Sequence, residues 1–329
     1  MRPAFQNTVK HAFNMKTVLA LALGAAACWT AAAGPLQKAR VAADARWVVH
    51  LDVEALLATQ VGQMLTREAL GPGLDAPSAA LKKQFGFEFD WRRIRSVTLY
   101  GSDFSGAEQL GGVMLLDTDM DVAGGLEAAL AKLAAAGRSG ARELQRLDDA
   151  PAPLYRMHDE VYVAADPGAP VVVGKAREAA VKARKVLAGG APNLNGASGF
   201  GEFCQSGDGF FFVAAAQGFS ELAPFPPQAQ VLRMADGLRL NLGEFANEVR
   251  ASLTLNTRTA ESAQQVQQIV QGLLALAMLT QHDQPEVQTL LQGTRVARSD
   301  KLVTLNLALP SAMLSRKLVE EQLGKRRPD

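Results

Sequence analysis

The sequence predicts an α+β protein made of two related halves, each a mostly antiparallel sheet with helices on one face. Alternating, β-branched segments come in pairs separated by short turns, which is typical of antiparallel hairpins. Helical segments with an apolar stripe follow these hairpins. The same order of elements occurs twice, before and after a Gly- and Asn-rich joint at residues 189–201.

The first half, residues 34–188, alternates between strand-like and helix-like patterns. Its expected elements are a strand from Trp47, a helix at 54–70, a hairpin at 94–118, a helix at 122–136, strands within 141–166, and a strand at 170–174 leading into a helix. This is a ferredoxin-like β-α-β-β-α-β order with extra hairpins.

The second half, residues 202–322, repeats this order. Its expected elements are a strand at 209–216, a hairpin at 231–257, a helix from 259 to about 280, a hairpin at 294–310 and a closing helix from Ser311. A short basic tail, 323–329, follows. Residues 97–133 and 238–273 each contain a hairpin, a Thr-containing junction and a helix, which indicates an internal duplication.

The two helices at equivalent places in this overlay are expected to pack on their sheets. The apolar side chains that we expect to be buried are Leu126, Leu130 and Leu133 in one helix and Val266, Ile269, Val270, Leu273 and Leu274 in the other. The joint contains few residues that could be buried, so we expect it to be the most mobile internal segment.

The element order and the segment "QGLLALAML…LQGTRVARSDKLVTLNLALP" resemble a loose group of bacterial exported proteins. These proteins consist of two related α+β halves and have no assigned function. The resemblance covers most of the chain after residue 33. It implies the fold and export, and it transfers no catalytic residue.

The N-terminus predicts a signal peptide at residues 1–33. Basic residues precede the apolar run "TVLALALGAAACW", and an A-x-A site places the cut after Ala33. Met15 is an alternative start. A lipoprotein cut before Cys28 is less favoured, because Ala25 stands where that motif prefers Leu. The expected location is periplasmic or extracellular, with no stable transmembrane span after the signal is removed.

Charge and cysteine content exclude some partners and crosslinks. Removing residues 1–33 lowers Lys plus Arg from 34 to 31 against 33 Asp plus Glu, a net charge of about −2. This balance gives no reason to expect a nucleic-acid partner. Cys204 then remains as the single cysteine, so an intramolecular disulfide is impossible. A packed thiol is favoured over a catalytic one there.

Three aspartates, Asp117, Asp119 and Asp121, stand just before the expected helix at 122–136. Their spacing is similar to the start of a calcium loop, but an EF-hand needs Gly and Glu where this chain has Val122 and Ala128. The equivalent junction in the second half has Asn and Thr and no carboxylate. Helix capping therefore explains the aspartates better than a cation site does.

Other motifs with catalytic or cofactor chemistry are incomplete. The "GAPVVVGKA" segment has the wrong spacing for a phosphate loop, and "GASGFG" around Ser198 departs from a serine nucleophile motif. The histidines after residue 33 are His50, His158 and His282, and none has zinc-site spacing. His50 and Asp52, two residues apart on one strand, form the least implausible acid–base pair. His50 itself is expected to face outward or to make one structural hydrogen bond.

The sequence therefore predicts no catalytic, cofactor-binding or metal-binding residue. We expect an exported, non-enzymatic binding or structural component of the bacterial cell envelope, with an unknown envelope protein or ligand as its partner. The alternative is a periplasmic hydrolase with a carboxylate-based site between the halves. The basic helix at 175–190 is expected to be a solvated face. Core packing is favoured for the helix at 266–281, with a homodimer interface as the alternative.

Overall fold

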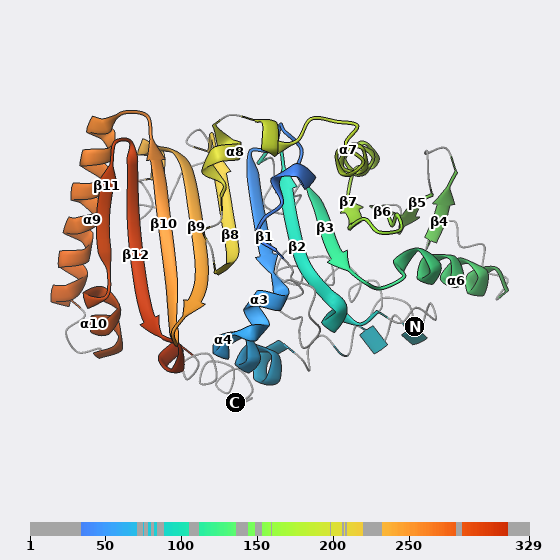
Figure 1. The fold of residues 1–329 in the computed structure, drawn as a ribbon, viewed down its shortest axis with the longest axis horizontal. Helices are drawn as coiled ribbons and strands as arrows, with labels where there is room; N and C mark the ends of the chain where they lie inside the picture. The colour runs from blue at the N-terminus through green and yellow to red at the C-terminus, as the bar shows by residue number, and fades with distance from the viewer. Residues whose placement is uncertain are drawn as a thin grey trace, which may run out of the picture.

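The computed structural model has an α+β fold built on one twelve-stranded antiparallel sheet (Figure 1). Its strand order is β11-β12-β10-β9-β8-β1-β2-β3-β7-β6-β5-β4. The structure describes residues 34–70, 75, 78–79, 82–83, 89–104, 112–135, 144–148, 153–158, 160–197, 199–205, 207, 209–219, 232–280 and 285–314. The predicted signal peptide, His282, Ser198 and the basic tail lie outside these residues.

The strands and helices fall close to the predicted segments. The strands are β1 (Trp47–Asp52), β2 (Ile94–Gly101), β3 (Val113–Thr118), β4 (Leu144–Leu147), β5 (Leu154–Met157), β6 (Val161–Ala164), β7 (Val171–Gly174), β8 (Phe210–Gln217), β9 (Ala235–Phe245), β10 (Glu248–Thr257), β11 (Arg295–Ser299) and β12 (Leu302–Pro310). The α-helices are α3 (Val53–Ala58), α4 (Gln60–Met64), α6 (Val122–Ala135), α7 (Arg177–Leu187), α8 (Phe200–Phe203), α9 (Ala260–Thr280) and α10 (Pro285–Gln292), and the 3-10 helices are η1 (Lys38–Arg40), η3 (Trp91–Arg93) and η5 (Leu194–Gly196).

The two halves share a single sheet, where the sequence predicted one sheet for each. β1 and β8, the first strands of the halves, pair antiparallel from Trp47↔Ala216 to Leu51↔Phe212. Each half then continues outward as a meander, β1-β2-β3 on one side and β8-β9-β10 on the other. The first half follows the predicted β-α-β-β-α-β order with extra strands, but its first strands pair as a meander, whereas a ferredoxin-like sheet interleaves its strands. The alternation of apolar residues indicates which segments are strands, but it does not indicate which strands pair with one another.

Helices cover both faces of the first half, so the prediction of helices on one face is wrong there. α7 packs on Leu154, Ala164 and Val172. α6 packs on the residues next in sequence, including Tyr155 and Val171, whose side chains point to the opposite face. Because β5, β6 and β7 carry apolar side chains on both faces, a helix packs on each face and buries them.

Connection order is similar in the two halves. In the first half, β3 leads into α6 and the last strand, β7, pairs with β3. In the second half, β10 leads into α9 and the last strand, β12, pairs with β10. This agrees with an internal duplication, which stays a prediction.

The described residues of the joint at 189–201 pack against the sheet. Leu194 and Phe200 are almost fully buried in the same core as Val48 and Val213. The Leu194 N–H also donates to the carbonyl of Val41 at 2.9 Å. These apolar side chains within a Gly-rich stretch anchor the segment, contrary to the expected mobility.

Helix α9 lies at one edge of the sheet, beside β11 (Figure 1), and only part of its apolar surface is covered. Ala263 and Val266 are fully buried against Leu255 and Val303, as predicted for Val266. Ile269 and Leu273 are 43% and 50% exposed, so the prediction that they are buried is wrong. The sheet ends at β11, so the side of α9 that carries these two residues has no described strand to pack on. In α6, Leu126 and Leu133 are buried and Leu130 is partly buried, as predicted.

We predict that Val266→Ala lowers the free energy of unfolding by about 1–3 kcal/mol, because it leaves a cavity beneath α9. The matched change Leu273→Ala should cost about 0.5 kcal/mol or less, because that side chain is half exposed. Urea denaturation of both variants checks this. Equal losses would show that Leu273 is covered in solution.

Candidate functional site

Only one of the three aspartates caps the helix that follows. The Gly124 N–H donates to Asp121 Oδ1 at 2.8 Å, as expected for an N-terminal cap of α6. In the second half, Thr259 makes the same contact with the Ser262 N–H at 3.1 Å. The capping interpretation is therefore right for Asp121 and wrong for Asp117 and Asp119.

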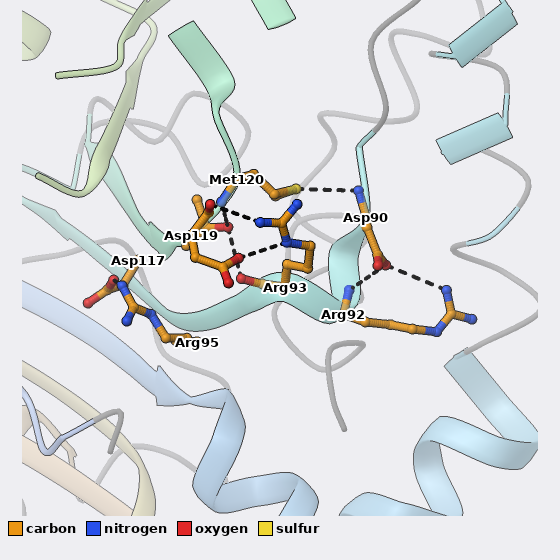
Figure 2. A network of polar contacts seen from close by, with 8 residues as sticks. Asp90, Arg92, Arg93, Arg95, Asp117, Asp119 and Met120 are labelled. Atoms are coloured by element: carbon orange, nitrogen blue, oxygen red, sulfur yellow. Dashed lines mark hydrogen bonds and ion pairs between the residues drawn. The ribbon is translucent and has the colours of Figure 1, made fainter. Parts of the chain in front are cut away.

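The other two aspartates form ion pairs with arginine side chains. Figure 2 shows Asp119 beside Arg93 of η3 and Asp117 beside Arg95 of β2. Asp119 Oδ1 accepts from Arg93 Nε at 2.8 Å on the protein surface. Asp117 lies deeper: its Oδ1 accepts from Arg95 Nη2 at 2.6 Å and its Oδ2 from Arg40 Nη1 at 2.9 Å. One carboxylate thus holds two guanidinium groups.

A β-bulge brings Arg95 to Asp117. Ile94 pairs with Thr118 and Ser96 pairs with Asp117, so the register shifts and Arg95 has no paired residue in the β2–β3 ladder. An extra residue of this kind bends a strand and redirects its side chain. Arg40 reaches the same carboxylate from the end of η1, and this pair ties the N-terminal segment to the sheet.

Beside Asp117 lies a small polar cavity of about 40 Å³ between the sheet and residues 34–40. It is lined by Gly34, Pro35, Gln37, Arg40, His50, Arg95, Ser96, Thr98 and Asp117. The register explains the polar floor, because His50 is paired with Thr98 and Asp117 with Ser96. Directly paired residues point to the same face of a sheet, so these four side chains gather there.

His50 is buried in this floor, only 4% exposed, and does not face outward. Its Nδ1 lies 2.8 Å from Thr98 Oγ1, and the backbone of Gly34 lies near the ring, but Nε2 makes no hydrogen bond of normal distance and angle with any described residue. Burial lowers the pKa of His50 to about 4, so the ring is neutral at pH 7.

Asp52, the other member of the predicted acid–base pair, acts as a cap. Its Oδ1 accepts from the Ala55 N–H at 2.9 Å at the start of α3, and the residue is 5% exposed. Burial raises the pKa of this carboxyl to about 6. Asp52 does not line the cavity, so the structure does not bring the pair together around one space.

Cys204 matches the simpler interpretation, and the basic helix matches it in part. Cys204 is fully buried in the core of the sheet, and burial raises the pKa of its thiol. On α7, Lys182 is exposed and contacts Asp44, as expected for a solvated face, but Arg184 is buried in an ion pair with Asp166. Within the described residues, no three His, Cys, Asp or Glu side chains gather as a metal site would require.

Four residues of this site were not predicted from the sequence: Arg40, Arg95, Ser96 and Thr98. A signal was present, because polar residues alternate along two strands: His50 and Asp52 in β1, Ser96 and Thr98 in β2. Polar residues that share one face of a central strand indicate a polar buried pocket. The bulge at Arg95 has no signature in the sequence.

Comparisons with known proteins give little further information. No protein-family model matches the chain, and no curated protein matches it. The solved structures that match include three crystal forms of TP0453. Form III is 12% identical, with TM-score 0.46, covering 88% of this chain and 100% of that one. Forms I and IV are 12% and 11% identical, with TM-scores of 0.44 and 0.45, covering 89% and 87% of this chain and 99% and 98% of those.

The candidate site predicts a specific pH dependence of stability. Between about pH 4 and 6.5 the unfolded chain binds a proton at His50 that the folded protein does not, so stability falls on acidification. Asp52 acts oppositely, because the folded carboxyl keeps a proton between pH 3.8 and about 6 that the unfolded one has released.

On acidification from pH 6.5 to 4.5, the free energy of unfolding of Asp52→Asn should therefore fall by about 2 kcal/mol more than that of the wild type. The variant lacks the carboxyl whose protonation stabilises the folded wild type over this range. His50→Asn should become more stable on acidification relative to the wild type. Urea denaturation at both pH values measures this. Parallel profiles for all three proteins would contradict the burial of these groups.

Asp121→Ala should lower the free energy of unfolding by about 0.5–2 kcal/mol, because it removes the cap of α6. The exposed pair of Asp119 contributes less, so Asp119→Ala should cost about 1 kcal/mol at most. Melting curves with calcium and with a chelator should coincide for the wild type. Calcium stabilisation that disappears in Asp121→Ala would instead indicate a cation site.

Proposed function

We propose that this protein is an exported, non-enzymatic binding component of the bacterial cell envelope that engages a partner protein through helix α9. The observation that carries this proposal is an exposed apolar surface. Among the described residues, five of the six exposed large hydrophobic side chains lie on α9: Ile269, Leu273, Leu276, Met278 and Leu279. Isolated apolar residues on a surface are ordinary, but a contiguous group marks an interaction site.

The exposed residues form a stripe of their own. Ile269, Leu273 and Leu276 follow one another by four and three residues, so they lie along one side of the helix. The buried side carries Ala263 and Val266 instead. Gly272 stands next to the stripe with open space around it, which leaves room for another helix to approach closely.

Charge indicates what kind of partner fits. Glu261 is the single charged residue of α9, and several glutamines occupy the rest of its polar surface. Arg298 is exposed on the neighbouring edge strand β11, on the same face of the sheet as Val303, against which α9 packs. The fitting partner is a protein helix with an apolar stripe flanked by carboxylates, because it would complement both surfaces. None of the described helices has the length and apolarity to cross a bilayer.

A hydrolase site between the halves is not favoured. The β1–β8 ladder occupies the junction where such a site was expected. The neighbouring cavity contains one carboxylate, and two guanidinium groups hold it. A general acid or nucleophile needs a carboxylate free to react, and no second one lines this cavity.

Site-specific photocrosslinking in cells tests the proposal. A crosslinking amino acid at position 276 should give an adduct with one envelope protein, whereas the same probe at Gln268, exposed on the same helix, should give little. Leu273→Glu should abolish the adduct without lowering the melting temperature. Arg298→Glu should weaken it, because the carboxylates of the partner would be repelled.

Three results would contradict this proposal: an adduct with a second copy of the chain alone, equal adducts at both positions, or stable binding to anionic lipid vesicles that Leu273→Glu abolishes. The first would establish the homodimer alternative, and the last a membrane surface.

A further inference from the structure

We propose that the cavity between residues 34–40 and strands β1, β2 and β3 is a binding site for a small monovalent oxyanion, with a carboxylate as the best match. Buried, unpaired polar groups, a local excess of positive charge and the cavity size support this assignment. It is independent of the contact proposed for α9, which lies elsewhere on the sheet.

Two of the residues that line the cavity each carry a buried polar atom without a hydrogen-bond partner among the residues that the structure describes. They are Arg95, through its Nε, and His50, through its Nε2. Buried polar groups in folded proteins are nearly always hydrogen-bonded, so two unpaired groups beside one cavity indicate an occupant. The His50 side chain is more than nine-tenths buried, so its ring is held inside the fold beside the cavity.

The tautomer of His50 suits an anion. If the Thr98 hydroxyl donates to Nδ1, the proton of the neutral ring lies on Nε2. Nε2 and Arg95 Nε are then both donors on residues that line the cavity. A carboxylate offers two acceptor oxygens and no donor, so it matches two N–H groups that need acceptors.

Charge points the same way. Two guanidinium groups, Arg40 and Arg95, face a single carboxylate, Asp117, and His50 is neutral. The lining therefore carries one excess positive charge, which one monovalent anion would neutralise. A metal cation would be repelled by this lining.

Size selects a small group. A volume of about 40 Å³ has room for roughly three water molecules, since one water needs about 10–15 Å³ by this measure. A carboxylate with one or two further atoms fits. The carboxylate could belong to a free acid such as acetate, or it could end a peptide chain.

The test is a titration of the exported protein, purified as cells secrete it, with sodium acetate, sodium chloride and phosphate at constant ionic strength. The ¹⁵N shift of His50 Nε2 reports the site directly. Acetate should shift this signal saturably, with a Kd of about 1–10 mM, and should raise the melting temperature; chloride and phosphate should do neither. A tripeptide of alanine, with a free or an amidated C-terminus, distinguishes a peptide carboxylate from a free acid.

Arg95→Lys is the decisive variant, because it keeps a positive charge beside Asp117 but removes the Nε donor. It should weaken acetate binding about tenfold. Arg93→Lys, on the neighbouring exposed pair with Asp119, is the matched control and should bind as the wild type does.

An unchanged His50 signal up to about 100 mM acetate would overturn the proposal and leave ordered water as the occupant. Equal binding by wild type and Arg95→Lys would overturn it as well. The wild-type titration decides the question even if a variant fails to fold.

Discussion

The antiparallel ladder between β1 and β8 is the constraint on which the rest of the molecule depends. It pairs the first strand of each half along five residues, so one continuous sheet replaces two. Each half then extends outward by hairpins, and β11 and β4 become the two edges. Because β1 lies between β2 and β8, its side chains are enclosed, and His50 and Asp52 are buried with shifted pKa values.

The same arrangement separates the polar cavity from the apolar helix surface. The cavity lies over the central strands, where residues 34–40 cover polar side chains and Arg40 ties that cover to Asp117. Helix α9 lies at the edge, where the sheet ends before the apolar surface of the helix does. A buried polar centre suits a small ligand, and an exposed apolar edge suits a macromolecular partner.

Ion pairs define the polar centre, and their contribution depends on burial. The Asp119 pair is exposed and contributes little to stability. Asp117 is shared by two arginines and is more enclosed, so losing it would leave two guanidinium groups facing each other. The bulge at Arg95 is what allows this sharing. Asp121, four residues further on, has a separate role as the cap of α6.

The sequence by itself determined the α+β class, most strand and helix positions, the presence of a capping aspartate before α6 and the burial of α9 around Val266. These follow from local periodicity and from hydrogen bonds between near neighbours. Tertiary structure alone decided that the halves share one sheet, that helices cover both faces of the first half, and that Leu273 is exposed while His50 is buried. Strand order, bulges and the position of a sheet edge depend on contacts between residues far apart in the chain, so no local pattern specifies them.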